Sequence, residues 1–147
     1  LVPDGTGQLT SDHGWDTLEH KQYLQDTIAV FKAAGIRTSI FVNADVKMIA
    51  GAKETGTDRI ELYTESYAKN YPQNKEAAIQ PFIEAAKVAN ELNLGINAGH
   101  DLSLENLNYF AKSIPGLLEV SIGHALISDA LYFGLENTVQ LYLRALK

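Results

Sequence analysis

The sequence predicts an α/β fold built on a parallel sheet, and two observations support this prediction. Four short apolar runs rich in β-branched and aromatic residues occur along the chain, and each is followed by a helical pattern. No linker, low-complexity tract or block of like charge interrupts the series, so we expect a single domain over residues 1–147. The expected strands are residues 38–43, 59–64, 94–99 and 118–123.

Helical periodicity lies before, between and after these runs. Gly35 is placed to end the first helix, because glycine readily adopts the left-handed conformation that closes a helix. Pro81 lies inside the third helical pattern, which predicts either a kink or a later helix start. The expected helices are residues 16–34, 44–55, 75–92, 104–113, 127–133 and 135–146.

A doubly wound sheet and a (β/α)₈ barrel both fit this alternation. A complete barrel takes about 250 residues, so a chain of this length holds about five of its eight units. Residues 1–2 are expected to be the tail of an earlier strand, and the start without Met indicates that further sequence precedes them. An open half-barrel leaves strand edges unpaired. We therefore expect either part of a larger barrel or a sheet closed by another chain.

Composition narrows the classes of function. The formal net charge is −6, which argues against broad nucleic-acid binding, since that requires a basic surface. Small phosphorylated ligands remain compatible, because backbone amides at helix N-termini bind them without net positive charge. The chain has no cysteine, which excludes disulfides and thiolate metal sites. Neither a membrane-length apolar run nor a signal peptide is visible, so we expect a cytoplasmic protein.

Polar residues at the carboxyl ends of the strands are the candidates for chemistry, because ligands of parallel sheets gather there. His100 follows a glycine at one strand end and can exchange a proton near neutral pH, although a loop histidine that caps the next helix fits equally well. Glu61 shares one side of its strand with Tyr63. In a barrel that side is either the interior, where a carboxylate needs a partner or ligand, or the outside.

Three further features of the sequence bear on function. Gly123 and His124 open a short helix after the last strand, which is typical either of a phosphate cradle or of a simple tight turn. Thr10 lies in a polar loop, where a turn role competes with binding a phosphate or hydroxyl. A metal site formed by Glu61, His100 and His124 lacks the usual ligand spacing and is disfavoured.

Several of these segments resemble those of the pyridoxine 5′-phosphate synthase family, in order and spacing. The resemblance covers essentially the whole chain, and its motifs are individually weak but fairly specific together. They comprise Leu1-Val2-Pro3, Leu9-Thr10-Ser11-Asp12, Gly14-Trp15-Asp16, Phe41-Val42-Asn43-Ala44-Asp45, Ile60-Glu61-Leu62-Tyr63-Thr64, Asn97-Ala98-Gly99-His100-Asp101-Leu102 and Ile122-Gly123-His124-Ala125-Leu126-Ile127.

The resemblance implies the last five or so units of a (β/α)₈ barrel in a cytoplasmic homo-oligomer, an octamer. It also implies condensation of 1-deoxy-D-xylulose 5-phosphate with 3-amino-2-oxopropyl phosphate, without metal or redox cofactor. His100 would be the proton donor and Glu61 a transition-state stabiliser. Thr10 would contact the deoxyxylulose phosphate, and the backbone at Asp101, Gly123 and His124 would hold the other phosphate.

Two departures from the family pattern matter. Position 101 is Asp where the family often has Gly, and a carboxylate beside a phosphate is repulsive unless it turns away. The family's other His and Glu acid/base residues and its arginine phosphate ligands lie on the first barrel strands, outside this chain. The resemblance therefore implies that these residues alone do not turn over substrate.

Two other interpretations stay open. Another phosphate-handling barrel enzyme, an aldolase or isomerase, has the same architecture, although no strand end carries the lysine that a Schiff-base aldolase needs. A non-catalytic half-barrel that self-assembles is the alternative from a different class. The measured mass in solution distinguishes it, because such a chain forms a stable assembly.

Overall fold

The four strands of the structure form one parallel sheet whose spatial order follows the chain, β1-β2-β3-β4. The structure is a computed structural model that describes all residues, 1–147. The strands are β1 (Ser39–Val42), β2 (Arg59–Tyr63), β3 (Gly95–Gly99) and β4 (Leu117–Ser121). Each begins within one residue of its predicted start, and helices connect successive strands. The predicted α/β class and parallel sheet are confirmed.

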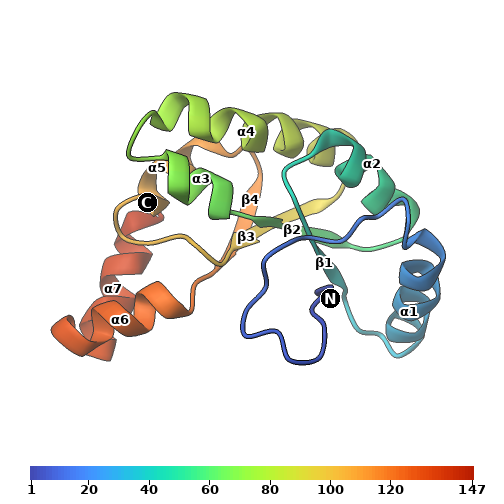
Figure 1. Ribbon diagram of the computed structural model, residues 1–147, viewed down its shortest axis with the longest axis horizontal. Coiled ribbons are helices and arrows are strands. Elements are labelled where there is room, and N and C mark those ends of the chain that lie inside the picture. The colour runs from blue at the N-terminus through green and yellow to red at the C-terminus, as the bar shows by residue number, and fades with distance from the viewer.

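The helices cover one face of the sheet, and Figure 1 shows α4 running along it. They are α1 (Lys21–Ala33), α2 (Val46–Glu54), α3 (Glu65–Asn70), α4 (Lys75–Glu91), α5 (Leu107–Ser113), α6 (His124–Phe133) and α7 (Leu135–Ala145). Contacts join α1 to α2, α2 to α4, α4 to α5 and α5 to α7, so the helical layer follows the order of the strands. This is the arrangement of consecutive units in a (β/α)₈ barrel.

Residue 1 extends the sheet beyond β1. The Leu1 amino group donates to the Ser39 carbonyl at 2.7 Å, and the Phe41 amide donates to the Leu1 carbonyl at 2.9 Å. One residue that bonds to positions 39 and 41 of its neighbour is the parallel pattern. The structure therefore has four strands and a one-residue continuation, where the sequence predicted about five units.

The two faces of the sheet differ sharply. Alternate strand residues such as Ile60 and Leu62 are fully buried under the helices, where they join a core of 23 residues. The intervening residues point to the opposite face and are mostly polar. That second group is Ser39, Phe41, Arg59, Glu61, Tyr63, Asn97, Gly99, Glu119 and Ser121.

Some helix boundaries differ from prediction. Helix α4 begins at Lys75 with Pro81 inside it, so the alternative of a later start is wrong. Asn74 is the cap, because its side chain accepts the Ala77 amide. Helix α5 begins at Leu107, three residues late, since local side-chain bonds from residues 103 and 106 replace its expected first turn. Helix α3 was not predicted.

Candidate active site

An open cavity of about 400 Å³ lies at the carboxyl ends of β2, β3 and β4. The strand register aligns Tyr63, Gly99 and Ser121, so the three strands end level with one another. Four of the six residues predicted from the sequence border this one cavity. Its lining consists of Glu61, His100, Ser121, Ile122, Gly123 and His124.

His100 has both ring nitrogens engaged. Its Nδ1 lies 3.1 Å from an Asp101 carboxylate oxygen, and its Nε2 lies 2.6 Å from the Thr10 hydroxyl. Because a carboxylate only accepts hydrogen bonds, Nδ1 carries a proton in this pair. Nε2 then accepts from Thr10 when the ring is neutral and donates to it when the ring is charged. This chain of contacts gives imidazole a defined route for proton exchange.

The backbone of His100 is unusual. Its φ is +89°, a left-handed conformation that non-glycine residues rarely adopt. The His100 amide donates to the Ser121 carbonyl at 3.1 Å, which ties the turn to the neighbouring strand. Such strained positions persist only where the surroundings hold them, and they are enriched at functional sites.

Thr64 joins the end of β2 to this turn. Its fully buried hydroxyl donates to the Gly99 carbonyl at 2.6 Å and accepts the Asp101 amide at 3.2 Å. The Asp101 amide is thus occupied in this structure, and a phosphate would have to compete for it. The Asp101 carboxylate is turned onto His100. One of its oxygens therefore faces the imidazole.

Glu61 points into the same cavity from the middle of β2. Burial raises the pKa of its carboxyl, and Glu119 adds to the effect, while the Leu1 amino group and His100 oppose it. Gly99 makes room for it: a Cβ at this position would lie 2.7 Å from Glu61 Oε1 and 2.5 Å from the Ser121 carbonyl. Because residue 99 is glycine, the carboxyl of Glu61 can occupy the space that a side chain would fill.

The N-terminus of α6 completes the cavity. Gly123 is the N-cap and His124 the first helical residue, so the first amides of α6 have no acceptor within the helix. The His124 ring centroid lies 6.1 Å from that of His100. A Cβ added to Gly123 would meet no atom within 4 Å, so the cavity is open at this point. Unpaired amides with a positive dipole end favour a phosphate or carboxylate.

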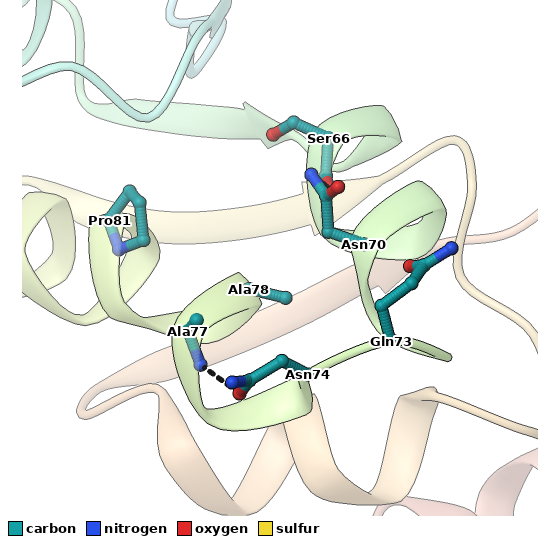
Figure 2. A pocket seen from close by; sticks show the side chains of 7 residues that line it. All are labelled: Ser66, Asn70, Gln73, Asn74, Ala77, Ala78 and Pro81. Atoms are coloured by element: carbon teal, nitrogen blue, oxygen red, sulfur yellow. Dashed lines mark hydrogen bonds between the residues drawn. The ribbon is translucent and has the colours of Figure 1, made fainter.

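Two neighbouring hollows have different linings. One of about 330 Å³ lies between α3 and α4, and Figure 2 shows its amide and small side chains, none of which titrates. Another of about 320 Å³ lies at the ends of β1 and β2 and includes Asp12 and Tyr63. No group of three or more His, Asp or Glu side chains is arranged to hold a metal ion. Acid/base groups and free amides meet in the cavity beside His100.

The sequence reasoning missed Ser121, and it assigned no role in the site to Thr64 or Tyr63. Ser121 lines the cavity and supplies the carbonyl that holds His100. Thr64 fixes the turn after β3, and the Tyr63 ring packs edge-on against His100 at 5.7 Å. All three lie at or just after the ends of β2 and β4, and this position in the sequence could have indicated a role in the site.

Comparison with known proteins gives a uniform result. The family model described as "Pyridoxal phosphate biosynthesis protein PdxJ" matches residues 1–147. Proteins named pyridoxine 5′-phosphate synthase from Christiangramia forsetii, Flavobacterium johnsoniae and Cytophaga hutchinsonii are 63%, 60% and 61% identical over 147 residues. The alignments cover 100% of this chain and 62% of each relative. None of the helices is long and apolar enough to cross a membrane.

Proposed function

Because the chain belongs to the family of the pyridoxal phosphate biosynthesis protein PdxJ, we propose that the whole protein is a pyridoxine 5′-phosphate synthase. It condenses 1-deoxy-D-xylulose 5-phosphate with 3-amino-2-oxopropyl phosphate to give pyridoxine 5′-phosphate, phosphate and water. The observation that carries the proposal is the single cavity where Glu61, His100 and the α6 N-terminus meet. The chain spans 62% of the length of its relatives, so these residues form only part of the proposed active site.

His100 is the proton donor in this proposal. Imine formation and dehydration each expel water, and the leaving oxygen must be protonated as its bond to carbon breaks. A ring held by Asp101 at Nδ1 presents Nε2 to the reactant once the Thr10 hydroxyl moves onto the substrate. The Asp101 carboxylate accepts from Nδ1 and so fixes the orientation of the ring, which leaves Nε2 directed at the reactant.

Glu61 is the partner group that stabilises positive charge developing on the condensing amine. Its carboxyl lies in a partly desolvated position, where an ion pair is stronger than in water. The raised pKa also lets the carboxyl carry a proton at a higher pH than a free glutamate would. Both properties suit a group that assists several successive proton transfers.

The two phosphates bind at different parts of the cavity. The free amides at Gly123 and His124 hold the phosphate of the aminooxopropyl substrate, helped by the α6 dipole. The Asp101 amide joins them when it exchanges its Thr64 hydroxyl for a phosphate oxygen. Thr10 contacts the deoxyxylulose phosphate. Remaining acid/base and arginine groups come from the first barrel strands by family resemblance, so the 147-residue chain alone is inactive.

We place the whole protein in the cytoplasm as a homo-oligomer, an octamer by family resemblance. Apolar side chains exposed on α6 and α7 support association, because such residues are normally covered. They include Ile127, Leu131, Tyr132, Phe133, Leu135 and Leu143. Sedimentation of the full-length protein as a monomer would contradict this part of the proposal.

The decisive test is His100→Ala in a protein extended to the full length of its relatives. Removing the donor should abolish ring closure, with a loss of at least about a hundredfold in kcat, the usual range for general acid catalysis. His20→Ala is the matched control, because His20 is exposed and lies outside the cavity. Near-normal turnover by a folded His100→Ala protein, measured as pyridoxine 5′-phosphate formed, would reject the role given to His100.

A further inference from the structure

Beneath the cavity, the polar face of the sheet carries a second set of charged residues. Arg59 on β2 donates from one guanidinium nitrogen to the Asn97 amide oxygen at 3.1 Å. The same nitrogen lies 2.9 Å from a Glu119 carboxylate oxygen on β4. Arg37, before β1, reaches the other oxygen of Glu119 at 3.5 Å. The Arg59 side chain thus crosses the whole width of β3 to reach its partner.

The sequence makes room for this crossing. A Cβ at Gly95 would lie 2.7 Å from Cγ and 3.2 Å from Cδ of Arg59, so the aliphatic stem of Arg59 lies directly on the glycine. The Arg59 side chain is 17% exposed, against 56% for Arg37. The Arg59 side chain is thus held in one position by the sheet and by its two partners. The Arg37 bridge is instead a surface contact, which contributes little.

These residues lie close to Glu61. The register aligns Glu61 with Asn97 and Asn97 with Glu119, so the three form one row across the face. Arg59 is two residues before Glu61 on β2 and points to the same face, about 7 Å along the strand. The titratable and charged groups around Glu61 are Arg59 and Tyr63 on its own strand, His100 after β3, Glu119 on β4, His124 on α6 and the Leu1 amino group.

We propose that Glu119 is a positioning residue that binds Arg59 across β3 and so holds the guanidinium away from the Glu61 carboxyl. A guanidinium free to approach a carboxylate favours the charged form strongly. With Arg59 drawn across β3 to Glu119, the two charges offset each other, and Glu61 keeps the ability to take up a proton. The role in turnover rests on the proposed function, while the electrostatic coupling does not.

Opposite charge changes at the pair should have opposite effects on Glu61. In Glu119→Gln the negative charge disappears and Arg59 is no longer offset, so the pKa of Glu61 falls. In Arg59→Met the stem remains but the positive charge beside Glu119 disappears, so the negative charge of Glu119 is less offset and the pKa of Glu61 rises. Arg37→Gln is the matched control, because it removes a charge that contacts the other oxygen of Glu119 and leaves the Arg59–Glu119 pair intact.

The measurement is an NMR titration of the Glu61 side-chain carboxyl carbon in the 147-residue chain and its three variants. The Leu1 amino group is present in all four chains, so its influence is common to them. We expect the titration midpoint to move to lower pH in Glu119→Gln, to higher pH in Arg59→Met, and to stay in place in Arg37→Gln. Equal midpoints in the unaltered chain and Glu119→Gln, or shifts of the same sign in both pair variants, would overturn the coupling.

Kinetics on the full-length protein separate this inference from the proposed function. Glu119→Gln should move the limb of the kcat–pH profile assigned to Glu61 toward lower pH, with the enzyme otherwise folded and saturable. A shifted NMR midpoint with an unmoved kcat–pH profile would keep the electrostatic coupling and remove Glu61 from the rate-limiting step. Should Arg59→Met fail to fold, the comparison of Glu119→Gln with Arg37→Gln still decides the question.

Discussion

At the residue scale, the site depends on groups held in costly arrangements. Glu61 is a carboxyl withdrawn from water against the backbone of Gly99, and burial raises its pKa. His100 adopts a φ of +89° to reach the cavity. Neither arrangement benefits the folded state, since desolvating a carboxylate and straining a backbone both oppose folding. The candidate active site therefore contains groups whose arrangement lowers the stability of the fold.

Replacing the Glu61 carboxyl should reveal this cost through its pH dependence. The folded-state pKa lies above the ordinary 4.5, so the folded chain binds more protons than the unfolded one and loses stability as pH rises through that window. The amide introduced by Glu61→Gln has no proton to lose, so the variant escapes this loss. We expect Glu61→Gln to gain stability relative to the parent as pH rises above 4.5, measured by urea unfolding at several pH values. A difference that is constant with pH would contradict the account.

Residue chemistry could be predicted only in part from the sequence. His100, Gly123 and His124 were accessible because polar residues that follow a strand in a parallel sheet reach the same edge. The contribution of Thr64 was not, because its hydroxyl bonds to groups 35 and 37 positions away. The sequence also did not predict which face of the sheet Glu61 lies on. Alternation places it on the same face as Tyr63 but does not say which face the helices cover.

At the element scale, strands were easier to predict than helix ends. Apolar runs bounded by polar residues predicted all four strands, whereas local side-chain bonds moved the starts of several helices. Asp16 accepts the amides of Leu18 and Glu19, so a capped turn precedes α1 and delays its start to Lys21. Helix α3 has six residues, too few to show a helical period in the sequence.

Helix α4 provides a test at this scale. Asn74 accepts the Ala77 amide at 2.9 Å, a bond drawn in Figure 2, and this cap sets the start of the helix despite Pro81. Asn74→Ala should lower the free energy of unfolding by about 1 kcal/mol, because the amide loses its acceptor. Gln80→Ala, on the exposed side of the same helix, is the control and should change stability little. Equal stability of Asn74→Ala and the parent would show that the cap is not required.

At the scale of the whole molecule, the helices protect one face of the sheet and leave the other polar and accessible. In Figure 1 the first residues of the chain, in dark blue, lie on the side of the sheet away from α4, and Thr10 of the loop that follows bonds to His100. Relatives of greater length share the sequence over the entire chain. Under the proposed function, the polar face is where the remaining barrel would pack, and the exposed surfaces of α6 and α7 are where other subunits would.

The central claim is that the cavity bordered by Glu61, His100 and the α6 N-terminus binds phosphorylated ligands. A ¹H–¹⁵N NMR titration of the chain with inorganic phosphate tests it most directly. We predict that the largest amide shifts occur at Gly123 and His124, with a smaller change at Asp101. Saturable shifts centred instead on the hollow between α3 and α4, with the α6 amides unmoved, would contradict the account.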